Sequence, residues 1–123
     1  MPGVCSFERM MLPTHALVGM ALALPIALFA PELAPAALLG GFVGGILPDL
    51  DLYSGHRKTL HFPTLYPLSA APAALLALVW STPVTTAAAF VLVGAAVHCR
   101  MDIYGGGLEL RPWEATSDRA VYD

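Results

Sequence analysis

Seven candidate metal ligands occur at four separate places in this chain. They are His15, Asp49, Asp51, His56, His61, His98 and Asp102. All four histidines of the chain are among them, and a hydrophobic chain seldom keeps this many ionisable groups without a use. Imidazole and carboxylate ligands together suit Zn, Mn or Fe better than Ca, which prefers oxygen ligands alone. The sequence therefore predicts a divalent metal site with Zn as the best-suited ion, and the excess of candidates over three or four ligands leaves one or two ions open.

At two of these places, the spacing between two candidate ligands would let both bind the same ion. His98 and Asp102 are four residues apart, so in a helix they lie on one face and can reach the same ion. In an extended segment, Asp49 and Asp51 point to the same side. Each pair also has an ordinary alternative, which is a helix-end histidine near a solvated aspartate in one case and a turn or cap in the other.

The expected roles divide these residues into two groups. The best metal ligands are His15, Asp49, His61, His98 and Asp102. Asp51 or His56 is expected to orient or deprotonate an attacking water, and Arg57 with Lys58 to neutralise a substrate phosphate. The alternative for Arg57 and Lys58 is that they only mark a cytoplasmic loop.

Composition indicates a membrane protein. Of the 123 residues, 57% are hydrophobic and 12% are charged, whereas soluble domains have about 45–50% apolar and about 25% charged residues. The net charge of −3 and the absence of a basic cluster argue against nucleic acid as a partner. The lipid bilayer is the expected environment, and a chain of this length holds one domain.

Four hydrophobic helices are predicted within a single helical membrane domain spanning 1–123. Their expected ranges are 14–30, 34–47, 65–80 and 83–104, followed by a C-terminal tail, 105–123. Prolines and threonines that suit helix starts set these limits, notably Pro13–Thr14 and Thr82–Pro83, and Pro25 is expected to kink the first helix. The second helix is the weakest membrane candidate, because about fourteen residues span only about 21 Å.

Short connections set the expected topology. The loops around 31–32 and 81–82 are too short for anything but antiparallel neighbours, which gives an all-α, up-down-up-down four-helix membrane bundle. This topology brings all four ligand-bearing places to one end. The basic residues fall at the same end and are Arg9, Arg57, Lys58, Arg100, Arg111 and Arg119. By the positive-inside rule, the metal cluster and both termini are expected on the cytoplasmic side of a multi-pass protein of the cell membrane.

Four glycines in the second helix form two overlapping GxxxG spacings. They are Gly40, Gly41, Gly44 and Gly45. Small residues at this spacing let another helix approach closely, so we predict close helix packing, with backbone looseness as the alternative.

In combination, the motifs resemble the YdjM-like family of membrane-bound metal-dependent hydrolases. The resemblance is carried by Thr14-His15-Ala16, by residues 45–51 (GILPDLD), by His56-Arg57-x-Thr59-x-His61, and by His98-x-x-x-Asp102 before a Gly-rich loop and Arg111-Pro112. It implies a helical fold and phosphoester chemistry related to zinc-dependent phospholipase C. This chain differs at Leu60, where the family has threonine. Family members also continue past the position of Asp123, which leaves open that the chain is a fragment of a longer helical protein.

Two functions are expected from these features. The leading hypothesis is a membrane-bound, metal-dependent hydrolase of a phosphoester at the membrane surface, with a lipid or lipid-linked substrate. The alternative is a membrane protein that binds metal for structure, sensing or transport without catalysis. Transport is the least favoured of these roles, because the ionisable groups lie at helix ends and not near the bilayer midplane.

Overall fold

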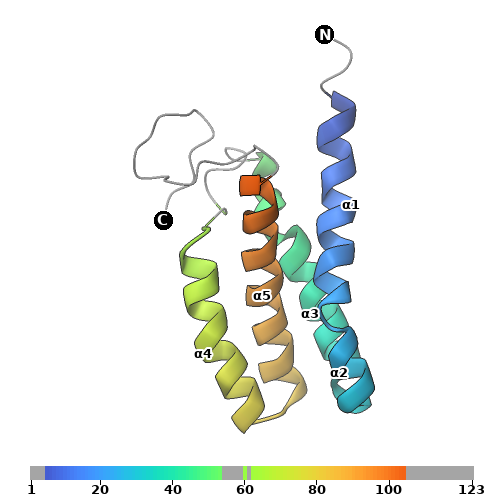
Figure 1. Cartoon of the computed structure of the whole chain (residues 1–123), viewed down its shortest axis with the longest axis vertical. Coiled ribbons are helices and arrows are strands. Elements are labelled where there is room, and N and C mark those ends of the chain that lie inside the picture. The colour runs from blue at the N-terminus through green and yellow to red at the C-terminus, as the bar shows by residue number, and fades with distance from the viewer. Residues whose placement is uncertain (1–4, 54–59, 61, 105–123) are drawn as a thin grey trace.

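The chain forms a bundle of helices (Figure 1). The computed structural model describes residues 5–53, 60 and 62–104, and the side chains of residues 13–50, 60 and 62–102. The helices are α1 (Cys5–Ala21), α2 (Leu24–Phe29), α3 (Ala34–Ile46), α4 (Leu65–Val79) and α5 (Pro83–Tyr104), with 3₁₀ segments η1 (Pro31–Leu33) and η2 (Leu47–Tyr53) on either side of α3. There is no strand in the described part of the chain. The all-α prediction is confirmed.

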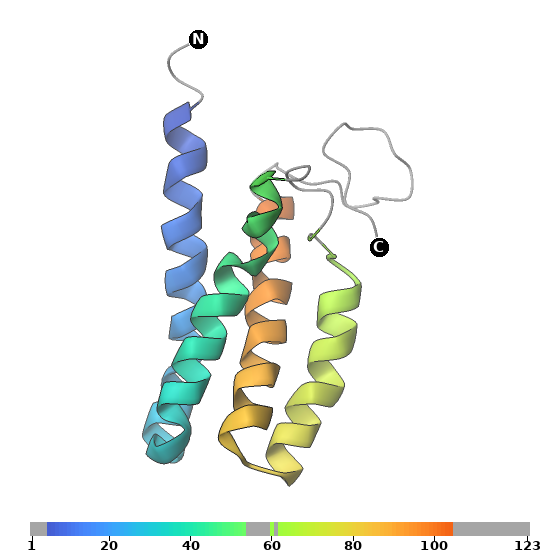
Figure 2. The same ribbon diagram turned by 180° about the vertical axis from the view of Figure 1, so that it is seen from behind.

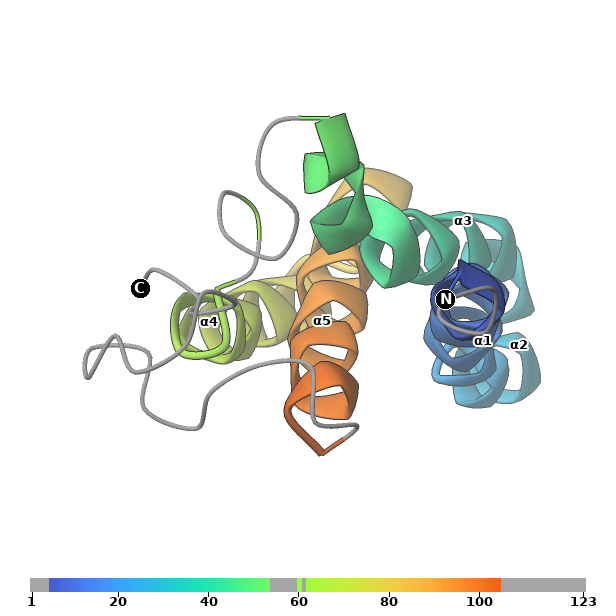
Figure 3. The same ribbon diagram turned by 90° about the horizontal axis from the view of Figure 1, so that it is seen from above.

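Helix α5 lies in the middle of the bundle. It packs against α3 and α1 on one side and against α4 on the other, which is clear when the molecule is seen from above (Figure 3). From behind, α3 and α5 run upward while α1 and α4 run downward (Figure 2). The starts of α1 and α4 and the ends of α3 and α5 therefore lie toward the same end of the molecule.

The first predicted helix differs from the observed one in two ways. Helix α1 begins at Cys5, well before the expected start, and continues through Pro13. A proline inside a helix removes one backbone hydrogen bond and bends the helix without having to end it. At Pro25 the effect is stronger, because the helix breaks after Ala21 and restarts as α2 with Pro25 in its first turn.

The second predicted helix is longer than expected. The helical path does not stop at Pro48 but continues from α3 into η2. Together with η1 this gives the stretch Pro31–Leu50, which is long and apolar enough to cross a membrane, as is Pro83–Asp102. The prediction that the second segment is the weakest membrane candidate is wrong, because 3₁₀ turns extend it at both ends. The apolar helices Pro13–Phe29 and Leu65–Val79 are shorter than these two stretches.

The glycines of α3 allow close packing against two different helices, α1 and α5. A Cβ atom at Gly41 would overlap the carbonyl oxygen of Gly19 on α1, whereas a Cβ at Gly44 would overlap the carbonyl oxygen of Val91 on α5. Gly45 faces α1 in the same way as Gly41. The prediction of close packing is confirmed, and each of the two overlapping GxxxG spacings contacts its own partner helix.

The interior is built from small residues and the surface from large ones. The buried hydrophobic residues of the described part are seven alanines and Cys99. Many large apolar side chains lie on the outside, with Phe29 88% and Leu28 80% exposed. A soluble protein seldom exposes so much apolar surface, but lipid accepts it, and small residues between helices are typical of packing inside a membrane.

The start of α5 is fixed by a reciprocal cap. The Thr85 backbone N–H donates to the Thr82 hydroxyl (3.2 Å), and the Thr82 backbone N–H donates to the Thr85 hydroxyl (3.1 Å). Thr82 is thus the cap that the sequence predicts, with Thr85 in the position that glutamate takes in the usual capping box. The cap sets where the long helix begins, far from the residues at its other end.

Candidate metal centre

Four predicted ligands meet at one end of the bundle. His15 comes from α1, Asp49 from η2, and His98 with Asp102 from successive turns of α5. All four are buried, with exposures of 4%, 8%, 1% and 2% in that order. Burial of two carboxylates is costly unless positive charge accompanies them, so the cluster calls for a cation or for protons.

The orientation of His98 is set by a backbone carbonyl. Its Nδ1 lies 2.6 Å from the carbonyl oxygen of Gly45. A carbonyl only accepts, so Nδ1 carries the proton and donates it. In the neutral ring, Nε2 then presents a lone pair. Metal-bound histidines are commonly held by this kind of bond from the other ring nitrogen to a backbone carbonyl.

The lone-pair side of His98 faces two carboxylates. Nε2 lies 3.3 Å from Asp49 Oδ1 and 3.3 Å from Asp102 Oδ2. His15 Nε2 lies 3.3 Å from Asp102 Oδ1. Charge-assisted hydrogen bonds are shorter, about 2.7–2.9 Å. In a tetrahedral site with metal–ligand bonds of about 2.0–2.1 Å, neighbouring ligand atoms lie about 3.3 Å apart. The separations fit the ligands of a shared ion better than direct hydrogen bonds.

The surroundings of His15 also indicate a metal site. Its Nδ1 is buried and has no hydrogen-bond partner among the described residues, with Asp49 Oδ2 at 3.8 Å. The rings of His15 and His98 lie 3.8 Å apart between centroids at an angle of 36°. Two protonated imidazoles this close would repel each other, whereas two neutral rings and two carboxylates carry a charge of −2 that one divalent cation balances.

The geometry defines a possible metal-binding site. One ligand atom each from His15, His98 and Asp102 lies within 4.8 Å of the others. Asp49 lies next to this group by the distances given above. Imidazole and carboxylate donors suit Zn, Mn or Fe. The residues present therefore fit a divalent transition metal.

The remaining predicted site residues are not placed. His56, Arg57, Lys58 and His61 lie outside the described residues. The backbone of Asp51 belongs to η2, which is helical, so the extended backbone from which the same-side pairing of Asp49 with Asp51 was expected is not present. The side chain of Asp51 is outside the described part.

Two glycines that support the site were not predicted as part of it. The carbonyl of Gly45 orients His98, and a Cβ atom at Gly45 would overlap the backbone of His15. Gly19 allows α1 to approach α3. The GxxxG pattern marked Gly45 as a packing residue, but nothing in the sequence indicates its carbonyl as an acceptor. Gly19 stands alone in its segment and carried no signal.

The chain matches a known protein family. A family model described as YdjM inner membrane protein matches residues 10–117. This confirms the resemblance drawn from the motifs, and the description names a location but no reaction. Searches of curated proteins and of solved structures found no match.

Proposed function

The chain belongs to the YdjM inner membrane protein family, and from this premise we propose that it is a metal-dependent hydrolase of the membrane. The observation that carries the proposal is the direction of His98. With Nδ1 donating to Gly45, its Nε2 faces Asp49 and Asp102 at distances suited to a shared cation. Asp49 completes the group formed by His15, His98 and Asp102. Zn is the preferred ion, and His61 is the proposed further ligand.

The donor types favour catalysis. Structural zinc sites are rich in cysteine, whereas catalytic sites combine histidines with a carboxylate and keep a position for water or substrate. When bound, the ion would supply Lewis acidity, which acidifies water and draws charge from a phosphoryl group. Asp51 or His56 is proposed to hold the water and take its proton.

A phosphoester of a lipid or a lipid-linked compound is the proposed substrate. The cluster lies at the helix ends, where headgroups of a bilayer would be within reach. Arg57 and Lys58 are proposed to neutralise the substrate phosphate. The four buried side chains offer no cationic group of their own for this task, so the substrate phosphate needs charge from neighbouring residues or from the ion.

A multi-pass arrangement is proposed for the described helices. Large apolar side chains are exposed on α1, α3, α4 and the start of α5, including Leu17, Leu39, Leu75 and Val84. Lipid contact on every helix is the simplest way to satisfy this surface. The sequence predicts that the basic residues lie at the metal-bearing end, and by the positive-inside rule we propose that this end faces the cytoplasm.

Cysteine labelling tests this orientation. In a variant with both native cysteines replaced by alanine, Ser81→Cys at the far end should react with an impermeant maleimide in right-side-out vesicles. Thr64→Cys, at the metal-bearing end, should react only after the vesicles are opened. Labelling of Thr64→Cys in sealed vesicles would contradict the proposed orientation.

Non-catalytic metal binding is the second candidate, and burial favours it. His15, His98 and Asp102 are each at most 4% exposed, and Asp49 is the most exposed member at 8%. Because the cluster is closed to solvent, it resembles a structural metal site, which has no open position for water or substrate. In this alternative, the metal would tie α1, η2 and α5 together.

Hydrolysis and metal content distinguish the two candidates. We expect the purified protein to carry a divalent metal and to hydrolyse a member of a phosphoester panel that includes phospholipids. The double variant Asp51→Asn with His56→Ala should retain the metal but lose at least about 100-fold in turnover, since it removes the proton acceptor. The variant His15→Ala should lose both the bound metal and the hydrolytic activity. A metal-loaded protein inactive on the whole panel would exclude the hydrolase and leave the structural role.

A further inference from the structure

A second pocket lies on the opposite side of α5 from the metal centre. It has a volume of about 370 Å³ and is lined by Pro63, Thr64, Pro67, Leu68, Ala71 and Arg100. Five of these residues come from α4 or the residues just before it, and Arg100 comes from α5. The size falls in the range of about 300–1,000 Å³ that is usual for small-molecule sites.

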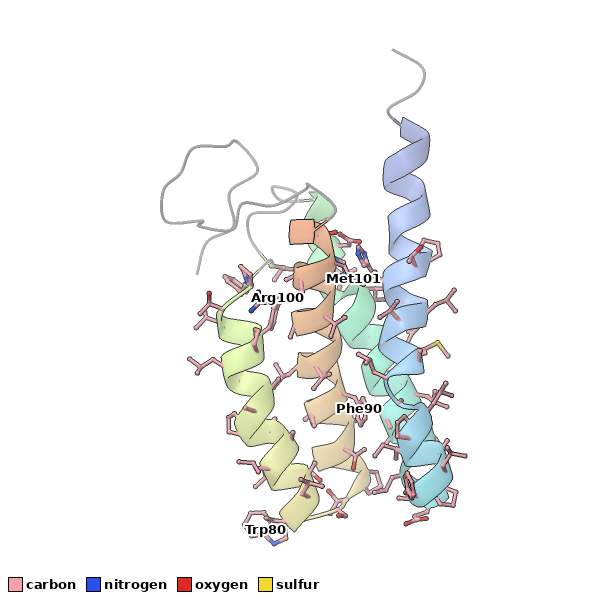
Figure 4. The ribbon with its side chains drawn as sticks, in the orientation of Figure 1. Trp80, Phe90, Arg100 and Met101 are labelled. Carbon is pink, nitrogen blue, oxygen red and sulfur yellow. The ribbon has the colours of Figure 1, made fainter. Side chains whose placement is uncertain are left out.

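Arg100 is separated from the metal ligands by the turn of the helix. It stands two residues from both His98 and Asp102, which in an α-helix is a rotation of about 200°. Figure 4 shows Arg100 extending toward the start of α4. It is exposed, and none of the described residues forms an ion pair with it. The metal centre does not use this charge.

The depth of Arg100 matches that of a lipid phosphate. It lies close to the end of the candidate span Pro83–Asp102, where arginine side chains reach the membrane interface. Trp80 is 62% exposed at the opposite end of α4, and tryptophan is typical of the other interface. Helix α4 thus has a positive charge beside its first turn and an exposed tryptophan at its other end.

Below the charge, the surface is apolar. Leu68, in the pocket, is 68% exposed, and Leu75 and Leu78 further along α4 are 64% and 77% exposed. The fifteen residues of α4 form a helix about 22 Å long, comparable to an extended acyl chain. A cationic end and an apolar wall are complementary to the two parts of a phospholipid.

We propose that this pocket binds one phospholipid, with its phosphate at the Arg100 guanidinium and an acyl chain along α4. The bound lipid covers the apolar surface between α4 and α5. The site is independent of the proposed hydrolase, because it lies on the other face of α5 and requires no metal.

Native mass spectrometry of the protein in micelles tests the site with two lipids of equal acyl chains, phosphatidylglycerol and diacylglycerol. The parent protein should retain phosphatidylglycerol in preference to diacylglycerol. Arg100→Gln should lower its retention about tenfold, as expected for one charge-assisted contact, and Arg100→Lys should keep most of it. Metal content should not change in either variant.

Steric variants keep the test independent of charge. Ala71→Trp fills the pocket and should lower retention of both lipids, whereas Ala88→Trp, an exposed alanine on α5 outside the pocket, should change neither. Arg100→Gln with the parent's lipid preference, or equal retention in the two tryptophan variants, would overturn the proposal. Release of phosphatidylglycerol by inorganic phosphate alone would also overturn it, since a free anion would then be the ligand.

Discussion

Replacing His98 by alanine is expected to remove the metal from the purified protein. The side chain is 1% exposed, held by the Gly45 carbonyl and placed between Asp49 and Asp102. Loss of an outer partner of a metal ligand costs about 10–100-fold in affinity, and loss of the ligand itself should cost more. The variant should also be less stable by about 3–5 kcal/mol, because two buried carboxylates lose their neighbour. Metal analysis and unfolding in mixed detergent micelles measure the two effects.

Cys99→Ala is the matched control for this substitution. Cys99 is the next residue on α5, is fully buried, and is not part of the metal-ligand group. It should keep the parent's metal content. If His98→Ala kept the parent's metal content and stability, the cluster would not be a metal centre.

Adding a single methyl group at Gly45 is expected to disturb both the fold and the site. The new Cβ would overlap the carbonyl oxygen of His15, and that atom belongs to backbone that cannot rotate away. Helix α1 must therefore move from α3, which displaces His15 from Asp102 and shifts the carbonyl that orients His98. We expect Gly45→Ala to destabilise the protein by about 2–3 kcal/mol and to lower metal content, although Gly45 contributes no side-chain ligand.

Leu39→Phe serves as the control for added volume on the same helix. Leu39 is 63% exposed on α3, so the larger side chain meets open space and should change stability by less than about 0.5 kcal/mol. Thermal unfolding followed by circular dichroism compares the variants. A Gly45→Ala protein as stable and as metal-rich as the parent would show that the α1–α3 contact does not position the site.

The sequence predicted the end of a helix best where that end is fixed by residues next to it in the chain. Thr82 and Pro83 fix the start of α5 because a cap and a fixed φ act within a few residues. Pro13 and Pro48 were less informative, since a proline weakens a helix by an amount that packing elsewhere can offset. That is why α1 starts early and α3 continues into η2.

The meeting of His15, Asp49, His98 and Asp102 could be predicted because it depends on helix direction alone. Alternating helices bring those four positions to one end whatever the details of packing. The role of Gly45 could not be predicted in this way, because a backbone carbonyl leaves no mark in the sequence. The extended backbone expected at Asp49 and Asp51 was wrong, because this segment forms a 3₁₀ helix, which turns by about 120° per residue.

Anomalous diffraction at the zinc absorption edge, from crystals of the protein purified without chelator, tests the metal centre most directly. The proposed site predicts one strong anomalous peak about 2.0–2.2 Å from His98 Nε2, a His15 ring nitrogen and an oxygen of Asp102, with Asp49 beside it. Peaks at the manganese or iron edge in the same place would change the ion but keep the site. An ordered cluster with no anomalous peak at any of these edges, and with histidine–carboxylate contacts shortened to about 2.7–2.9 Å, would contradict it and leave a network of buried ion pairs.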